Sequence, residues 1–376
     1  MEEVKIFIAG DFAPRMRVTD IIEKGHYEFL YNDLLPIMQS ADYSIVNLEA
    51  PIAKTPTPIK KTGPNLIAPT KSVKALKYVP FNMVTLANNH AMDQGKHGLE
   101  STINLLKENA IEYVGAGLSE KEIQEPRYLN IKGKTIAIIN CCENEWSTTL
   151  AEGAGCNPLN EIAIYYQIEI AKKQSDYCIL IIHGGHEMYE LPSPRMVKLY
   201  RWFIDLGVNA VIGHHTHCFS GHEIYKGCPI VYSLGNFIFD NMPSTQSIWF
   251  KGCAAILHFY DTDMTIELVP FNQCGKEVGV HLLSDEGNYL FFEHANKLKS
   301  IIEDQSRLEA EFSKFVQSVG SKYNTYLEPS QNRYILAALK RGWLPSMIKG
   351  NQRRLLLNLI RCESHRDIVN QILSID

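Results

Sequence analysis

The segment between Gly213 and His217 combines residue types and a spacing that suit metal binding. It reads Gly-His-His-Thr-His and directly follows the apolar run 210–212. Burying three neutral imidazole rings side by side without polar partners is unfavourable, and an exposed loop has no reason to concentrate them. Neutral imidazole is the commonest metal ligand, and a His-x-His pair can turn two ring nitrogens toward one centre. The segment therefore predicts a metal site, with His215 and His217 as ligands and His214 in reserve.

The same arrangement, a short apolar run followed by a polar residue, recurs along the chain. Runs rich in Ile and Val that end at Gly or Asn are typical of strands covered on both faces. The runs are 5–9, 43–46, 83–87, 178–182, 210–212 and 229–232. In layered α/β folds, ligands bind beyond the carboxyl ends of such strands. We therefore expect the polar residues that follow these runs to meet at one site.

These polar residues form a mixed set of oxygen and nitrogen donors. The candidate metal ligands are Asp11, Glu49, Asn89, His183, His215 and His217. Such a set suits Zn, Mn or Fe and is too rich in nitrogen for Ca or Mg. We expect one or two divalent ions, with Glu49 placed to bridge the two. Further candidates for the site are Asn47, His186, Glu187, His214 and Asn236.

Two residues close to Asn89 have the types expected for proton transfer. Two metal ions ~3.5–4 Å apart would lower the pKa of a bridging water and hold the oxygens of a phosphoryl group. His90 would then face the leaving group as a general acid or charge stabiliser. Asp93, three residues later, is placed to orient the His90 ring and keep it protonated. Both are therefore predicted to be catalytic.

Several of these residues also have a purely structural explanation. Asp11 can cap a helix, and Glu49 can be a solvated turn residue. Asn236 is explained almost as well by a turn at a strand end. His183 alone would more often be a satisfied core histidine, but the neighbouring His186 and the acidic residue after it favour a site. The metal interpretation therefore depends on the whole set rather than on any single member.

The composition is that of an ordinary globular protein. The 376 residues are 45% hydrophobic and 21% charged, and they suffice for one large domain with an appendage or for two domains. The formal net charge of −5 and the lack of a basic, aromatic surface on the main body predict no nucleic-acid partner. No run approaches the ~20 apolar residues of a membrane span, and the first residues lack the features of a signal peptide. The nine scattered cysteines contain no Cys-x-x-Cys pair, so we expect a cytoplasmic protein.

The pattern of elements changes near residue 285. Before it, strands alternate with helices, and two hairpins are predicted within 127–139 and 252–270. The expected helices are 96–109, 160–173 and 195–206, and after residue 285 they are 289–308, 309–323, 333–339 and 353–374. We therefore predict a body of two sheets flanked by helices over 1–284 and a helical C-terminal region over 285–376.

Part of this helical region is both basic and apolar. Seven basic residues and no acidic one lie between Arg333 and Arg361. A stretch of this kind can lie on an anionic membrane surface, so 329–361 is a candidate for peripheral contact at the inner face of the membrane. The alternative, which we favour, is a helical cap that packs on the catalytic body and keeps its charges in water.

Five short motifs occur in an order and spacing that resemble one known family. They are Gly-Asp at 10–11, Asn-Leu-Glu-Ala-Pro at 47–51, Ala-Asn-Asn-His at 87–90 with Asp93 and Gly95, Gly-His-His-Thr-His at 213–217, and Tyr-Ser-Leu-Gly-Asn-Phe at 232–237 with Phe239 and Asp240. They resemble the CapA family of capsule and poly-γ-glutamate biosynthesis proteins, in the metallophosphatase-like superfamily. The resemblance covers roughly residues 4–240. It implies a four-layer α/β/β/α fold and, by analogy, a dinuclear metal site.

The resemblance also implies a function. It implies a metal-dependent hydrolase linked to capsular or exopolysaccharide or poly-γ-glutamate production, which uses metal-activated water. The substrate would be a phosphoester, or an amide or ester of a polymer precursor. One departure weakens the two-metal expectation, because ordinary metallophosphatases carry Asp-x-His where this chain has Ala13. It favours the alternative of a non-catalytic accessory protein in a capsule synthesis machinery, whereas His90 favours the enzyme.

Overall fold

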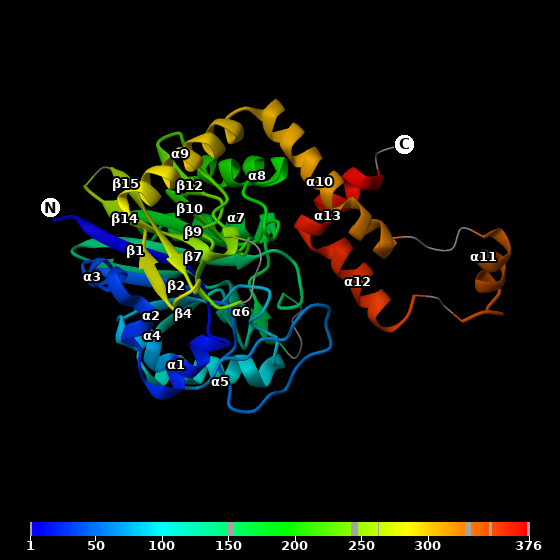
Figure 1. Ribbon diagram of the computed structural model, residues 1–376, viewed down its shortest axis with the longest axis horizontal. Helices are drawn as coiled ribbons and strands as arrows, with labels where there is room; N and C mark the ends of the chain where they lie inside the picture. The colour runs from blue at the N-terminus through cyan, green and yellow to red at the C-terminus, as the bar shows by residue number, and fades with distance from the viewer. Residues whose placement is uncertain are drawn as a thin grey trace.

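Two β-sheets face each other at the centre of the protein, and helices cover the outer face of each (Figure 1). The computed structural model describes residues 2–148, 153–241, 247–261, 263–327, 332–345 and 348–373. The first sheet has the order β16 (Val280–Leu282), β15 (Met264–Gln273), β14 (Lys251–Phe259), β1 (Val4–Ala13), β2 (Tyr43–Leu48), β3 (Met83–Thr85) and β4 (Glu112–Val114), and β13 (Asn236–Phe239) also pairs with β1. The second sheet has the order β11 (His222–Tyr225), β12 (Cys228–Val231), β10 (Ala210–His214), β9 (Tyr177–His183), β7 (Lys134–Cys142) and β6 (Arg127–Ile131). A short ribbon pairs β5 (Ala116–Gly117) with β8 (Gly155–Cys156).

The alternation of side chains along β1 explains the layers. Successive residues of a strand point to opposite faces of the sheet. Ile6 and Ile8 therefore belong to the core between the two sheets, where Ile138 of β7 also lies. Phe7 and Ala9 belong to the core beneath the helices of the first sheet. Because both faces of β1 are buried, the expected four-layer α/β/β/α fold is confirmed.

The two outer layers of helices are formed by different parts of the chain. The first sheet is covered by α1 (Arg17–Lys24), α2 (Glu28–Tyr31), the 3₁₀ turn η1 (Asn32–Leu34), α3 (Leu35–Gln39), α4 (Ser72–Tyr78) and α5 (Gly95–Glu108). The second sheet is covered by α7 (Glu161–Lys172) and α8 (Pro194–Asp205), and the short elements α6 (Glu120–Gln124) and η2 (Ser247–Phe250) lie between strands. Asn160 and Ser193 cap α7 and α8 through their side chains, as these residue types are expected to do.

The C-terminal region differs from the prediction in its helix boundaries. It contains α9 (Asp285–Ile302), α10 (Gln305–Leu327), α11 (Arg333–Lys340), α12 (Gly350–Arg361) and α13 (Glu363–Leu373). The single helix predicted over 353–374 is wrong, because Cys362 is extended, with ψ 126°, and its buried side chain separates α12 from α13. The break between α9 and α10 precedes the predicted one, because Asp304 Oδ1 accepts the Arg307 N–H at 3.1 Å and begins α10.

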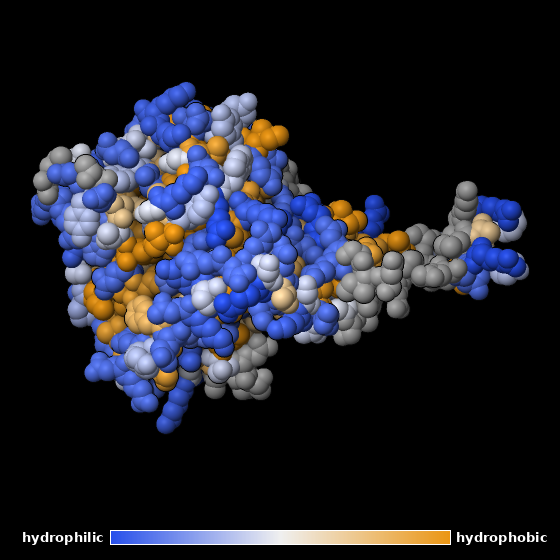
Figure 2. Space-filling model, turned by 90° about the horizontal axis from the view of Figure 1, so that it is seen from above, coloured by the Kyte–Doolittle hydropathy of each residue, from blue (hydrophilic) through white to orange (hydrophobic). Residues whose placement is uncertain are grey.

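The helix α11 lies away from the body (Figures 1 and 2). Tyr334 and Trp343 are exposed, and the Arg341 guanidinium lies 5.0 Å from the centre of the Trp343 ring. Residues 329–331 and 346–347 of the candidate membrane segment lie outside the described residues. In contrast, α12 and α13 pack against α10, as expected for a cap. Membrane contact by 329–361 stays a prediction.

No helix in the described part of the chain has both the length and the apolar content needed to span a membrane.

Candidate metal centre

The expected polar residues meet where parallel strands of the two sheets end. β1, β2 and β3 run parallel in the first sheet, and β9 and β10 run parallel in the second. This brings the segments that follow these strands to one edge of the two sheets. Gly213 allows the strands to approach closely, because a Cβ there would lie 2.0 Å from the Tyr232 carbonyl oxygen. A side chain is excluded at Gly10 for the same reason, because a Cβ there would lie 2.0 Å from the Gly235 carbonyl oxygen.

One group of donor atoms converges around His183. Its Nε2 atom lies 3.0 Å from His215 Nδ1, 3.1 Å from Asn89 Oδ1 and 3.7 Å from Glu49 Oε1. A single ring nitrogen cannot form hydrogen bonds of good geometry with all three groups at once. Atoms of Glu49, His183 and His215 all lie within 4.8 Å of one another, which is an arrangement that a metal ion can satisfy.

A second group shares Glu49 with the first. It joins Asp11, Glu49 and His217, whose donor atoms also lie within 4.8 Å of one another. Asp11 Oδ2 lies 3.7 Å from His217 Nδ1. All six candidate ligands are therefore in these two groups or within hydrogen-bonding distance of them, and Glu49 occupies the position between them that was expected for a bridging carboxylate.

Glu49 is the residue whose environment is hardest to explain without a cation. Its side chain is completely buried, and neither carboxylate oxygen has a hydrogen-bond partner among the described residues. Burial raises the pKa of Glu49 well above its ordinary value, and the Asp11 carboxylate raises this pKa further. A buried, unpaired carboxylate is strongly unfavourable. The donor set therefore fits a divalent cation.

Burial favours the neutral, metal-binding form of two candidate imidazole ligands, His183 and His217. Burial lowers the pKa of His183 well below its ordinary value, and the neighbouring His215 lowers it further. Burial also lowers the pKa of His217, although Glu187 and Asp11 oppose this effect. Neutral rings keep a lone pair free for a cation.

The two histidines after β10 adopt an uncommon backbone conformation. His215 has φ 95° and His217 has φ 58°. Positive φ is rare for residues with a branched or bulky side chain and tends to occur at functional sites. The centres of the two rings lie 6.1 Å apart. Asp11 Oδ2 accepts the His215 backbone N–H at 3.2 Å and lies 3.7 Å from His217 Nδ1.

His90 is connected to Asp93 as the sequence predicted. His90 Nδ1 lies 2.6 Å from Asp93 Oδ2, and the Leu66 N–H also donates to this oxygen at 2.6 Å. His90 Nε2 lies 4.0 Å from Glu49 Oε1. Asp93 therefore fixes the His90 ring so that its second nitrogen faces the ligand groups, which is the orientation needed for proton transfer to a substrate held there.

Sequence reasoning missed Lys61, which lies in the loop between β2 and α4. Its ammonium group forms an ion pair with Asp93, and it lies 3.3 Å from His90 Nδ1. The Lys61 side chain is only 2% exposed, so the cation is part of the site. No local pattern marks this lysine, because residues 54–67 form a polar loop whose position depends on the body around it.

The further candidates take different positions. Asn47 Nδ2 donates to Asp11 Oδ1 at 2.7 Å, and Asn236 Oδ1 lies 3.0 Å from His217 Nδ1, so both orient ligands. His214 Nδ1 lies 3.6 Å from Asp11 Oδ1. Both His214 ring nitrogens are buried without a hydrogen-bond partner among the described residues. This ring is therefore a candidate donor beside Asp11.

His186 lies apart from the ligand groups. Its Nε2 donates to the Ser364 carbonyl oxygen at 2.9 Å, and its ring packs edge-on against Phe312 and Phe315. The structure therefore places His186 in the contact with the C-terminal helices. Its neighbour Glu187 instead lines the cleft beside His90.

The buried His186 predicts acid sensitivity of this contact. Burial lowers its pKa from the ordinary value of 6.5 to about 3. The folded state then binds its proton less readily than the unfolded state, so stability is lost as the pH falls from 6.5 toward 3. The free energy of unfolding of wild type should therefore fall by about 2 kcal/mol more than that of His186→Gln when the pH is lowered from 7 to 4.5. Urea unfolding at the two pH values measures this, with the exposed His97→Gln as the control; an unchanged difference would contradict it.

A cleft of about 290 Å³ opens beside the ligand groups. Asn89, His90, Lys61 and Glu187 line it from the body. The other wall comes from the C-terminal helices, through Tyr323, Leu355, Asn358, Leu359 and His365. Nothing in the sequence around His365 indicates a site.

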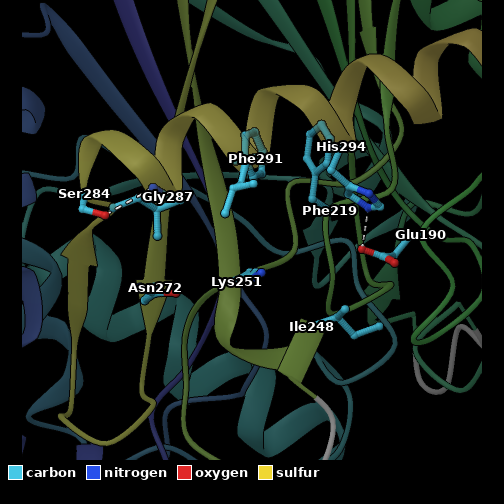
Figure 3. Close-up of a pocket in the computed structure, with 11 residues that line it drawn as sticks. Glu190, Phe219, Ile248, Lys251, Asn272, Ser284, Gly287, Phe291 and His294 are labelled. Carbon is cyan, nitrogen blue, oxygen red and sulfur yellow. Dashed lines mark hydrogen bonds and ion pairs between the residues drawn. The ribbon is translucent and has the colours of Figure 1, made fainter.

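A second cavity, of about 410 Å³, lies beneath α9 (Figure 3). Phe219 and Phe291 form its apolar part, Lys251 lies on its floor, and an ion pair between Glu190 and His294 lies at one end. None of the candidate metal ligands lines it. The larger of the two cavities is therefore separate from the candidate metal centre.

Comparison with known proteins adds a family and several relatives. Residues 5–241 match the sequence model described as bacterial capsule synthesis protein PGA_cap. The chain is 31% identical over 248 residues to the capsule biosynthesis protein CapA of Bacillus anthracis, which covers 64% of this chain and 60% of that protein. It is 30% identical over 236 residues to the PGA biosynthesis protein CapA of Bacillus subtilis (strain 168), which covers 61% of this chain and 62% of that protein. The chain thus spans less than two thirds of the length of either relative.

Solved structures give a weaker likeness. A crystal structure of a hypothetical protein from Thermus thermophilus is 13% identical, with a TM-score of 0.47. The match covers 72% of this chain and 99% of that one.

Proposed function

The chain belongs to the bacterial capsule synthesis protein family, and from this premise we propose that it is a metal-dependent hydrolase acting in the production of a capsular polymer. The polymer class is an exopolysaccharide or poly-γ-glutamate. The bond cleaved is a phosphoester, with an amide or ester of a polymer precursor as the alternative. The observation that carries the proposal is the buried carboxylate of Glu49, unpaired between two groups of ligand-type atoms.

Two sets of residues would hold the metal. Glu49 is shared, with His183, His215 and the Asn89 amide on one side and Asp11 and His217 on the other. A bound Zn, Mn or Fe ion would act as a Lewis acid on a substrate oxygen and lower the pKa of a water molecule. The first set contains two imidazoles and the second has one, so we expect the first set to bind more tightly.

The protein's own residues position and protonate the substrate. Asp93 holds the His90 ring through Nδ1 and leaves Nε2 directed toward the ligand groups. From there His90 can donate a proton to a leaving oxygen. The Lys61 ammonium balances the Asp93 charge, so the pair adds little net charge beside an anionic phosphoryl group.

A combined metal and activity assay tests the proposal. Purified protein should contain at least one divalent ion per chain and hydrolyse bis(p-nitrophenyl) phosphate or p-nitrophenyl phosphate. His90→Ala should keep the metal and lower kcat by about 10²–10⁴-fold, as expected for loss of a general acid. His97→Ala is the matched control, because this exposed histidine of α5 lies outside the cleft.

One outcome would favour a different function. Less than one metal per chain, together with activity unchanged by His90→Ala, would contradict the hydrolase. The chain would then be a non-catalytic accessory protein of a capsule polymer synthase that retains the fold. The replacement of the expected imidazole by Ala13 is the feature that favours this alternative.

A further inference from the structure

The wall that the C-terminal helices contribute to the cleft is fixed to the body by buried polar contacts. The Glu363 carboxylate accepts the Asn144 backbone N–H at 2.8 Å and the Asn144 side-chain amide at 2.7 Å. Arg195 forms an ion pair with Asp367, at 2.8 Å. All of the helical residues involved belong to α13. The position of α13 beside the metal centre is therefore determined by specific partners rather than by apolar packing alone.

This wall carries a histidine that has a free ring nitrogen. His365 Nδ1 lies 2.7 Å from the Tyr323 hydroxyl, which holds the ring. His365 Nε2 has no hydrogen-bond partner among the described residues and is not among the buried unsatisfied atoms. The residue is partly exposed and lines the cleft with His90, Lys61 and Glu187. Tyr323 thus fixes one nitrogen while the other stays available to a ligand.

The groups on either side of His365 suit an organic substrate. Leu355 and Leu359 of α12 line the same wall. Trp146, from the loop after β7, also lines the cleft, and the Arg361 guanidinium stacks 4.4 Å from the centre of its ring. Apolar walls with a few placed polar groups are the usual form of a small-molecule site. At about 290 Å³, the cleft suits a small molecule or one end of a chain.

We propose that His365, held by Tyr323, is a specificity-determining residue that binds a second anionic group of the substrate, distinct from the phosphoryl group at the metal centre. This inference rests on the proposed function, because it assumes a phosphoryl group at the metal. An imidazole that donates from Nε2 to an anion forms a charge-assisted hydrogen bond. The substrate class is therefore an organic phosphoester with a carboxylate or a second phosphate on its leaving part. Both His365 and Tyr323 lie outside residues 5–241, the part of the chain that matches the family model.

Binding of non-hydrolysable phosphonates tests the inference without requiring turnover. Full-length protein loaded with Zn²⁺ is titrated with phenylphosphonate, 4-carboxyphenylphosphonate and 1,4-phenylenebisphosphonate by calorimetry. Wild type should bind at least one of the two doubly anionic probes about tenfold more tightly than phenylphosphonate, as expected for a charge-assisted hydrogen bond. Comparison of the carboxylate with the second phosphonate identifies which anion the subsite prefers.

Three variants locate the effect. His365→Ala should abolish the preference, so that the three probes bind about equally, and His365→Gln, which keeps a donor, should retain part of the preference. Tyr323→Phe should weaken the preference less than His365→Ala, because it only frees the ring, and His97→Ala should match wild type. Far-ultraviolet circular dichroism and thermal unfolding check that each variant is folded.

The outcomes separate this inference from the proposed function. Equal binding of all three probes by wild type, or a preference that survives in His365→Ala, would overturn the subsite and leave the metal centre intact. No binding of any probe would overturn both. If wild type hydrolyses neither phosphoester but still prefers a doubly anionic probe, the result would count against the hydrolase and support the subsite.

Discussion

Replacing Glu49 with glutamine is expected to abolish metal binding and hydrolysis while stabilising the metal-free protein. The carboxylate is completely buried and both of its oxygens lack hydrogen-bond partners among the described residues. A neutral amide is easier to bury than a carboxylate, so the metal-free variant should gain about 1–3 kcal/mol in free energy of unfolding at neutral pH. In the metal-loaded state the order should reverse, because only wild type gains stability from the bound ion.

The pH dependence of this difference identifies Glu49 as its source. Burial raises the Glu49 pKa well above its ordinary value of 4.5. Below pH 4.5 the carboxyl group is protonated in both the folded and the unfolded state, so it does not make the free energy of unfolding depend on pH. Above pH 4.5 the unfolded state loses the proton first, so the stability of metal-free wild type falls as the pH rises. The gap between Glu49→Gln and wild type should therefore widen from pH 4.5 upward.

Thermal unfolding in the presence and absence of a chelator measures both effects. The matched control is Glu223→Gln, because Glu223 is also buried but accepts hydrogen bonds from Arg201 at 3.0 Å and Tyr232 at 2.6 Å. This substitution should destabilise the protein at neutral pH. A metal-free Glu49→Gln protein that is less stable than wild type would contradict the interpretation of Glu49 as a ligand awaiting a cation.

The second large effect is expected at Arg195. Its guanidinium joins the body to α13, with Nη2 2.5 Å from Glu143 Oε1 and Nε 2.8 Å from Asp367 Oδ2. Burial raises the pKa of Glu143, but Arg195, the Ser364 hydroxyl and the neighbouring His186 together outweigh burial and keep this pKa below its ordinary value. Arg195→Met would leave a buried carboxylate without its cation. Removal of one partner of a buried ion pair is destabilising by about 3–5 kcal/mol.

Loss of Arg195 should also release α13 from the body. Urea unfolding would report the loss of stability, and limited proteolysis should cleave the variant near α12 and α13 faster than wild type. Arg366→Met is the control, because Arg366 is 48% exposed and lies 3.8 Å from Glu363, and exposed pairs contribute about 0–1 kcal/mol. Equal stability of Arg195→Met and Arg366→Met would show that the buried pair does not hold the helix.

The convergence of the residues that follow the central strands was predictable from the sequence, because one general rule of layered folds covers it. Parallel strands of a layered fold bring their carboxyl ends to one edge, so Asp11, Glu49 and His183 could be placed together without knowledge of the packing. The CapA family and the four-layer fold were predicted and are confirmed. Local chemistry also sufficed for the contact of His90 with Asp93, since the two residues are three positions apart.

Other members of the cleft were not predictable, because their positions depend on long-range packing. Lys61 lies in a loop without regular structure, and only its ion pair with Asp93 reveals its role. His186 was a further candidate for the site, yet its ring packs against Phe312 instead. His365 lies more than 140 residues after the last of the family's motifs that supply ligands. Their assignment required the folded arrangement.

The sequence by itself determined which types of side chain meet at the candidate site, because residue types and strand ends are local features. It specified a mixed carboxylate and imidazole set, its place at the edge of the sheets, and the family. Only the tertiary structure decided which groups lie unpaired in the interior, as Glu49 does, and which surface closes the cleft. The physical reason is that burial and the contacts of α13 with Asn144 and Arg195 arise between segments far apart in the chain. No local pattern of residues records such contacts.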